Sequence, residues 1–287
     1  MIVARGRSEL ARALAALPRP LGVVPTMGAL HEGHLALVDQ ARAANASVAV
    51  TLFVNPTQFG PHEDFNRYPR PIERDLAQCA QAGVDLVFNP PVEEIYPAGF
   101  ATTVSVDGLS TRWEGERRPG HFAGVATVVA RLLNLLAADR AYFGEKDYQQ
   151  LQVVRRMAAD LALPVEIVGC ETIRDADGLA LSSRNVYLSA EDRRRAPALS
   201  RALRAAASLA EAGETSVSVL ERAACAILDV GGLEIDYLAI VDAETLEPIE
   251  RVTGVARALG AVRLGPVRLI DNVAVLAGPA SGASSNA

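Results

Sequence analysis

The sequence predicts an α/β fold: a doubly wound, Rossmann-like parallel sheet with a second, smaller α+β domain. Over roughly the first 170 residues, short apolar runs alternate with segments of helical periodicity, which is the pattern of βαβ units. Beyond that point helices are followed by strands, which is typical of a separate α+β domain. We therefore expect domains at 1–174 and 175–287.

In the first domain, helices are indicated by apolar residues at helical spacing, and strands by short apolar or β-branched runs that end at proline. Ser8 is the expected cap of the first helix, which Pro18 ends. In chain order we expect a helix at 8–17, a strand at 21–26, a helix at 33–45, a strand at 47–56, a helix at 70–83, a strand at 85–91, a helix at 121–141, a strand at 140–147 that runs into the next helix, that helix at 148–163, and a strand at 164–170.

In the second domain, alanine-rich segments at 190–213 and 216–229 have helical character. Three later runs are expected to form antiparallel strands, at 232–249, 254–265 and 267–278. The last residues, 280–287, are small and polar, and we expect them to form a disordered tail.

Composition excludes several functional classes. The net charge is −6 and the pI about 5.4, which argues against a nucleic-acid or membrane-surface binder, since both need a basic field. The three cysteines are odd in number and form no close pair, so reduced thiols in a cytoplasmic protein are expected. The N-terminus lacks the unbroken apolar core of a signal peptide, and no window has the apolar length of a membrane span.

Ligands of open parallel sheets bind at the carboxyl ends of the strands, so polar residues that directly follow a predicted strand are candidates for a site. The first such stretch is PTMGALHEGH, residues 25–34. Its glycines allow close backbone approach, and His31 and His34 can donate to an anion together with the following helix N-terminus. A phosphate cradle and a loop with two solvated histidines both fit this spacing. A metal site fits less well, because the histidines are not at i, i+4 and no third ligand is evident.

Two further clusters follow strands. After the second strand, Asn55 and Gln58 suit recognition of a hydroxyl or carboxylate, although an ordinary polar loop is the simpler interpretation. In FGEKD, residues 143–147, Glu145 or Asp147 could cap the next helix. Lys146 is more informative, because a cation in the first turn of a helix is unfavourable unless an anion is present.

A fourth cluster lies in IRDADGLALSSRNVYLS, residues 173–189. Ser182, Ser183 and Arg184 place two hydroxyl donors beside a fixed cation, which suits a mobile loop that closes over polyphosphate. A linker with an incidental Ser-Ser-Arg is the alternative. Arg117, Arg118 and His121 precede the long apolar helix, and their spacing alone suggests no role.

Taken together and in this order, the stretches PTMGALHEGH, FVNPTQF, FGEKDYQQL and SSRN resemble the pantothenate synthetase (pantoate–β-alanine ligase) family. The family belongs to the nucleotidyltransferase superfamily, in which the HxGH motif is widespread. The resemblance implies that ATP activates (R)-pantoate as an adenylate, and that β-alanine then attacks it to give pantothenate and AMP. It also implies a first domain that binds ATP and pantoate, a second that acts as a lid, a homodimer, and Mg²⁺ with the ATP.

The resemblance also assigns roles to residues. His34 matches the family's proton donor, and His31 is expected at the phosphates. Both act with Lys146 and with the Ser182–Arg184 cluster as the catalytic set. Gln58 and Gln150 match the pantoate-binding residues, and Gln58 also borders β-alanine. The expected ATP contacts are Met27, Gly28, Ala29, Leu30, His31, Glu32, Gly33, His34, Gly144, Glu145, Lys146, Asp147, Ile173, Leu181, Ser182, Ser183 and Arg184.

One position departs from the family pattern. Relatives have two adjacent acids linked to the metal in the helix that here reads IERDLAQ, whereas this chain has Arg74 followed by Asp75. Asp75 is therefore the one expected protein ligand of Mg²⁺. Two other hypotheses stay open on sequence alone: a nucleotidyltransferase that retains the nucleotide on its product, and a non-catalytic nucleotide-binding module.

Overall fold

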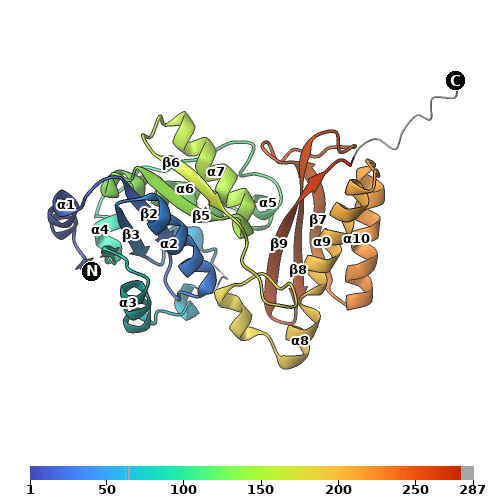
Figure 1. The fold of residues 1–287 in the computed structure, drawn as a ribbon, viewed down its shortest axis with the longest axis horizontal. Coiled ribbons are helices and arrows are strands. Elements are labelled where there is room, and N and C mark those ends of the chain that lie inside the picture. The colour runs from blue at the N-terminus through green and yellow to red at the C-terminus, as the bar shows by residue number, and fades with distance from the viewer. Residues whose placement is uncertain (62, 64, 279–287) are drawn as a thin grey trace, which may run out of the picture. The chain divides into compact units, whose positions relative to one another are not determined.

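The protein is described by a computed structural model in which residues 1–61, 63 and 65–278 are placed. The chain divides into two compact units, Met1–Ile173 and Arg174–Ala287 (Figure 1). The tail expected at 280–287 lies outside the described residues.

A six-stranded, fully parallel sheet forms the centre of the first unit, with strand order β1-β4-β3-β2-β5-β6. The strands are β1 (Ile2–Ala4), β2 (Leu21–Thr26), β3 (Ser47–Leu52), β4 (Leu86–Phe88), β5 (Arg140–Gly144) and β6 (Glu166–Cys170). All but β1 lie within the runs that the sequence indicated. The doubly wound parallel sheet is therefore confirmed, with β1 added at one edge.

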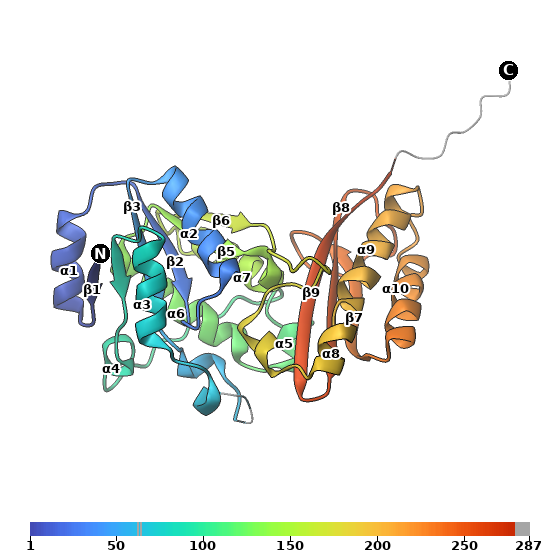
Figure 2. The same ribbon diagram turned by 60° about the horizontal axis from the view of Figure 1, so that its bottom comes forward.

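Helices cover both faces of this sheet (Figure 2). They are α1 (Arg7–Ala16), α2 (Glu32–Ala44), α3 (Ile72–Gln81), α4 (Val92–Ile95), α5 (Glu114–Arg117), α6 (His121–Leu136) and α7 (Tyr148–Asp160). One core joins α1, α6 and α7 to alternate strand residues such as Leu21, Val23 and Phe88. The other joins α2 and Cys79 of α3 to the intervening ones, such as Val24 and Val50. Alternation of side chains along each strand thus supplies both cores.

The strand order reverses between β2 and β5, and this reversal positions the site. Strand β2 pairs with β3 along its whole length, from Leu21 to Thr26. Its pairing with β5 is confined to Gly22 and Val23 opposite Arg140 and Ala141. The carboxyl ends of β2 and β5 are therefore not joined by ladder pairing. In open α/β sheets such a reversal is where ligands bind.

Helix α1 begins one residue earlier than expected, and its predicted Ser8 cap is wrong. Gly6 is the N-cap, and the Glu9 carboxylate accepts the backbone N–H groups of Arg5 and Gly6 at 2.7 and 3.3 Å. Glu9 can do this because a carboxylate in the first turn satisfies amides that have no partner within the helix. Helix α6 ends at Leu136, where Ala137 takes a left-handed conformation, so it stops short of the expected residue 141.

The second unit pairs a three-stranded antiparallel sheet with two long helices, which confirms the smaller α+β part of the fold. Its elements are α8 (Ala190–Arg195), α9 (Ala198–Glu211), α10 (Val217–Gly231), β7 (Glu234–Asp242), β8 (Val255–Leu264) and β9 (Val267–Leu276). The helix expected at 190–213 is interrupted at Pro197, whose ring cannot continue a helical hydrogen-bond ladder. Residues of α9 and α10, such as Leu203 and Leu228, pack with Ile240 and Val262 of the sheet in one core.

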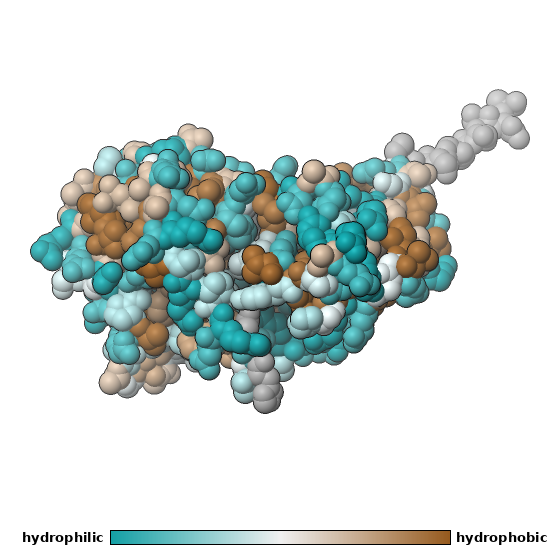
Figure 3. All heavy atoms as spheres, turned by 90° about the horizontal axis from the view of Figure 1, so that it is seen from below, coloured by the Kyte–Doolittle hydropathy of each residue, from teal (hydrophilic) through white to brown (hydrophobic). Residues whose placement is uncertain are grey.

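The surface is predominantly hydrophilic on the face that Figure 3 displays, and apolar residues form separate small patches there. Among the described residues, no helix combines the length and the hydropathy needed to cross a membrane.

Candidate active site

Three loops of the first unit follow the carboxyl ends of neighbouring strands. Residues 27–31 follow β2, residues 53–58 follow β3, and the short turn Glu145–Asp147 follows β5. The turn ends in Asp147, which is the N-cap of α7 but makes no side-chain capping bond. The polar stretches singled out after strands in the sequence thus stand at strand ends in the structure.

Side chains fix the loop after β2 from within the protein. Gly28 and Ala29 both have left-handed backbones, with φ of 80° and 52°. The Thr26 hydroxyl accepts the Gly28 N–H at 3.1 Å. The fully buried Asp75 carboxylate accepts the N–H groups of Ala29 and Leu30 at 2.8 and 2.9 Å. An alanine in this region costs roughly 1–2 kcal/mol, so the surrounding contacts must enforce the loop's shape.

The two histidines of this loop are paired with each other and with nearby backbone. His31 is the N-cap of α2, and its Nδ1 accepts the Gly33 N–H at 3.1 Å. The Nδ1 of His34 accepts the His31 N–H at 3.4 Å, and the ring centroids are 4.1 Å apart. A ring nitrogen that accepts a bond from a backbone amide carries no proton. In their neutral forms both imidazoles are therefore Nε2–H tautomers, and Nε2–H is the one donor of each ring.

Both of these imidazoles are uncharged near neutral pH. Burial lowers the pKa of His31, and the positive charge of Lys146 lowers it further. Burial lowers the pKa of His34 to about 3, with smaller contributions from His31 and Lys146. The turn after β5 and the loop after β2 leave neighbouring strands at the same edge of the sheet, and the charge of Lys146 lowers the pKa of both rings. His31, His34 and Lys146, which were predicted to act together, are therefore brought together within the first unit.

Six backbone donors between Gly28 and His34 are already in use within the protein, which bears on the expected phosphate cradle. The amides of Gly28, Ala29, Leu30, His31, Gly33 and His34 all donate within the protein. We expected backbone amides of the loop and the helix start to face an anion. In the structure these six amides form hydrogen bonds within the protein instead.

Lys146 is the only lysine in the sequence, and every other basic side chain apart from histidine is an arginine. A lysine places a compact charge, whereas arginine is a broad planar fork. The Lys146 Nζ lies 3.6 Å from the Asp147 carboxylate, and the side chain is about one-fifth exposed. This singular use of lysine is a signal that sequence inspection alone could have supplied.

Gln58 is held at the end of β3 by a buried network. Its side-chain oxygen accepts from Asn55 at 3.1 Å, and its amide nitrogen lies 3.2 Å from the Met27 sulfur. Asn55 in turn donates to the Gly124 carbonyl and accepts from the Tyr96 hydroxyl. Gly124 is required here, because a Cβ at this position would lie 2.4 Å from the Thr57 carbonyl oxygen.

His121 and Arg118 support the same network, a role that their spacing in the sequence did not reveal. The His121 Nδ1 donates to the Gln58 carbonyl at 2.8 Å, since that oxygen can only accept. Its Nε2 accepts from the Arg118 guanidinium at 3.0 Å, since that group can only donate. Arg118 also forms a salt bridge of 2.7 Å with Glu63. Burial lowers the pKa of His121 to about 4, so this ring is a neutral Nδ1–H tautomer.

The neighbouring glutamines of α7 have different environments. Gln149 is buried and holds the preceding loop, because it donates to the Leu109 and Arg112 carbonyls and accepts the Glu114 N–H. Gln150, predicted to bind pantoate, is half-buried. Its side chain makes no hydrogen bond within residues 1–61, 63 and 65–278, which leaves its amide available to a ligand.

The remaining predicted residues lie at or beyond the division of the chain. Ile173 is the last residue of the first unit, and Leu181, Ser182, Ser183 and Arg184 belong to the second. Ser182 caps the 3₁₀ turn Ser183–Tyr187 by accepting the Arg184 N–H at 3.3 Å.

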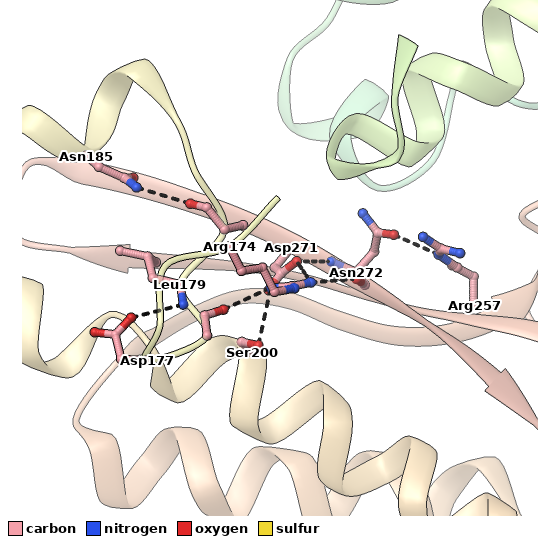
Figure 4. A network of polar contacts seen from close by, with 10 residues as sticks. Arg174, Asp177, Leu179, Asn185, Ser200, Arg257, Asp271 and Asn272 are labelled. Carbon is pink, nitrogen blue, oxygen red and sulfur yellow. Dashed lines mark hydrogen bonds and ion pairs between the residues drawn. The ribbon is translucent and has the colours of Figure 1, made fainter. Parts of the chain in front are cut away.

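The segment leading to Ser182 is anchored by an ion pair within the second unit (Figure 4). Arg174 donates to both oxygens of the buried Asp271 carboxylate at 2.6 and 2.8 Å. The same guanidinium bonds to Ser200 and to the Gly178 carbonyl, and Asn185 donates to the Ala180 carbonyl. A two-pronged, largely desolvated pair of this kind fixes orientation as well as position. The segment that precedes the Ser182–Arg184 cluster is therefore held in place by side-chain contacts.

The predicted metal ligand, Asp75, lies in an environment that does not suit a metal ion. Within the placed residues there is no group of three or more His, Cys, Asp or Glu side chains able to hold an ion. Asp75 is fully buried, and both of its oxygens accept backbone N–H groups. A hydrated Mg²⁺ needs exposed oxygen ligands, so this arrangement does not fit the Mg²⁺ role expected for Asp75.

The histidine assignments predict an unusual titration. At about pH 5, where an ordinary histidine is charged, His34 and His121 should stay neutral, as Nε2–H and Nδ1–H tautomers respectively. Correlation spectra of the ring nitrogens would measure both properties. Because both folded pKa values lie below that of an unfolded histidine, their stabilising contribution is complete above about pH 6.5 and is lost as the pH falls toward 4 and 3. Midpoints near 6.5, or the opposite tautomers, would contradict the assignment.

Comparison with known proteins agrees with the resemblance seen in the sequence. The family model for pantoate-beta-alanine ligase matches residues 3–274. The chain is 57% identical over 270 residues to pantothenate synthetase from Thermus thermophilus, covering 93% of this chain and 98% of that protein. It is 55% identical over 254 residues to the Moorella thermoacetica pantothenate synthetase, covering 88% and 90%.

Solved structures give the same result. A crystal structure of the Thermus thermophilus enzyme aligns with a TM-score of 0.91 at 56% identity, covering 95% of this chain and 99% of that one. Pantoate-beta-alanine ligase from Francisella tularensis, solved with beta-gamma ATP and beta-alanine, aligns with a TM-score of 0.79 at 33% identity, covering 95% and 97%. The chain therefore belongs to the pantoate–beta-alanine ligase family.

Proposed function

We propose that this protein joins (R)-pantoate to β-alanine at the expense of ATP, forming pantothenate, AMP and pyrophosphate through a pantoyl adenylate. The observation that carries the proposal is family membership along nearly the whole chain, at 57% identity to a pantothenate synthetase. The Francisella tularensis relative, which was solved with a form of ATP and β-alanine, supports the same substrates.

In the first step the pantoate carboxylate attacks the α-phosphorus of ATP, and pyrophosphate leaves. A carboxylate is already ionised at neutral pH, so this step needs no general base. It needs donors that stabilise negative charge on phosphate oxygens in the transition state. The Nε2–H groups of His31 and His34 and the Lys146 ammonium supply such donors. A neutral imidazole acts here by hydrogen bonding, and a pKa of about 3 keeps His34 neutral.

We assign pantoate to the side chains at the ends of β3 and β5. Gln58 is oriented by Asn55 and Met27 before any substrate arrives, which lowers the entropic cost of binding. Gln150 offers a carboxamide that has no partner within the described residues. Together these amides can bind the hydroxyl and carboxylate groups of pantoate, and Gln58 borders the position of β-alanine. In the second step the β-alanine amine attacks the activated carbonyl and AMP leaves.

The second unit takes part, in this proposal, through Leu181 to Arg184. Two hydroxyls and a guanidinium match the needs of a triphosphate, and the Arg174–Asp271 pair gives this segment a firm base. We assign the unit the role of a lid over ATP. Mg²⁺ is expected to arrive with ATP and to be held by phosphate oxygens and water.

The expected homodimer and cytoplasmic location stay part of the proposal. The homodimer rests on the family resemblance. The location is supported by the three cysteines, Cys79, Cys170 and Cys225, which are free thiols rather than disulfides.

The reaction is tested by exchange of pyrophosphate into ATP. With pantoate present and β-alanine absent, labelled pyrophosphate should appear in ATP, because adenylate formation is reversible. Without pantoate there should be no exchange. Exchange that requires a different acid, or a product that retains the nucleotidyl group, would show a different nucleotidyltransferase. ATP binding without any release of pyrophosphate would indicate a non-catalytic nucleotide-binding module.

Lys146→Ala should slow pantoyl adenylate formation by about 10²–10³-fold while the fold survives, judging by the loss of single transition-state donors in other enzymes. Single-turnover formation of the adenylate measures the rate, and thermal unfolding checks the fold. Lys146→Arg is the matched variant, because it keeps the charge but replaces the compact ammonium by a planar fork. We expect it to recover only part of the rate. An unchanged rate in Lys146→Ala would remove Lys146 from the mechanism.

A further inference from the structure

We propose that Asp75 is a positioning residue for adenylate formation, and that Arg74 assists it. The proposal rests on the function proposed above and concerns the loop from Gly28 to His34. Neither side chain needs to touch a substrate in this role. Both act on the backbone that carries the two histidines.

The contacts place Asp75 directly behind the loop. Its carboxylate reaches from the first turn of α3 to the amides of Ala29 and Leu30, which lie 46 and 45 residues earlier in the chain. The side chain is fully buried. The space beside it is also filled, because a Cβ on Gly28 would lie 3.0 Å from the Asp75 Oδ2. Loop and carboxylate therefore fit each other closely.

Arg74 binds the other backbone polar group of the same residue, Leu30. Its Nη2 donates to the Leu30 carbonyl at 3.2 Å, while Asp75 accepts the Leu30 N–H. Adjacent residues of α3 thus bind both polar groups of Leu30, and His31 follows directly. The arginine that departs from the family pattern has a partner in this loop.

A buried carboxylate is costly unless it is well compensated. Removing a charge from water is unfavourable, and here two charge-assisted hydrogen bonds and the first turn of α3 offset that cost. The result fixes a left-handed alanine that would otherwise relax. Once Leu30 is fixed, His31 starts α2 in the orientation that presents both Nε2–H groups. Asp75 thereby controls where the phosphate donors lie.

Asp75→Asn tests the proposal. The amide keeps the shape but places an NH₂ group opposite one of the two loop amides, so two donors meet. Adenylate formation should fall about 100-fold, because small misplacements of catalytic groups have effects of that size. Conversion of supplied pantoyl adenylate and β-alanine to pantothenate should fall at least about 10-fold less, because it does not involve the leaving pyrophosphate. Equal slowing of both steps would indicate general damage to the fold and would overturn the proposal.

Mg²⁺ concentration separates this role from metal binding. If Asp75 held Mg²⁺, a higher Mg²⁺ concentration would restore the Asp75→Asn rate. A misplaced loop would not respond, and rescue by Mg²⁺ would therefore contradict the positioning role. Glu73→Gln, an exposed acid on the same turn of α3, is the matched control and should leave both steps unchanged.

Two outcomes keep this test apart from the test of the reaction itself. If the unaltered protein shows no pantoate-dependent exchange, the proposed function fails. If the unaltered protein shows this exchange and Asp75→Asn forms the adenylate at the same rate, only the positioning role fails. Should Asp75→Asn not fold, Arg74→Ala carries the test, because Arg74 is exposed. Arg74→Ala should slow adenylate formation about 3-fold and leave the second step unchanged. An unchanged rate of adenylate formation in this variant would overturn the proposal.

Discussion

The reversal of strand order between β2 and β5 is the constraint on which the first unit depends. Strand β2 pairs with β3, and β5 pairs with β6, as far as the carboxyl end of each strand. The pairing between β2 and β5 stops after two residues. The loops that leave them must therefore turn to opposite faces of the sheet. At this point the chain places its paired histidines and its only lysine.

Phosphate recognition in the proposed site differs from that of a glycine-rich loop in its choice of donors. A glycine-rich loop presents backbone amides to the phosphates. Here five amides after β2, those of Gly28, Ala29, Leu30, His31 and Gly33, are bound by Thr26, Asp75 and the histidines themselves. This internal use of amides removes flexibility from the loop and fixes the tautomers of both rings. The hydrogen bonds that occupy these backbone amides thus also orient the imidazole side chains.

The fold could be predicted from the sequence because its signals are local. The runs at 21–26 and 47–56 are apolar, β-branched and ended by proline, and PTMGALHEGH stands directly after the first of them. The edge strand β1 escaped notice because three residues are too few to show a period. The break at Pro197 was missed because alanine-rich sequence on both sides reads as one helix.

The supports of the site could not be predicted, because they join residues far apart in the chain. Asp75 lies 46 residues from Ala29, and His121 lies 63 residues from Gln58. A helix with Asp75 on its inner face has the same pattern whether the carboxylate holds a metal or a loop. Only the positions of the two amides, at 2.8 and 2.9 Å, decide between these interpretations.

The most direct test is a crystal structure with a non-hydrolysable ATP analogue and pantoate. The account predicts phosphate oxygens within about 3.2 Å of the Nε2 atoms of His31 and His34 and of the Lys146 Nζ. It also predicts that the Asp75 carboxylate keeps both of its backbone amides in that complex. A triphosphate bound by the amides of Ala29 and Leu30, with Asp75 displaced from them, would contradict the account.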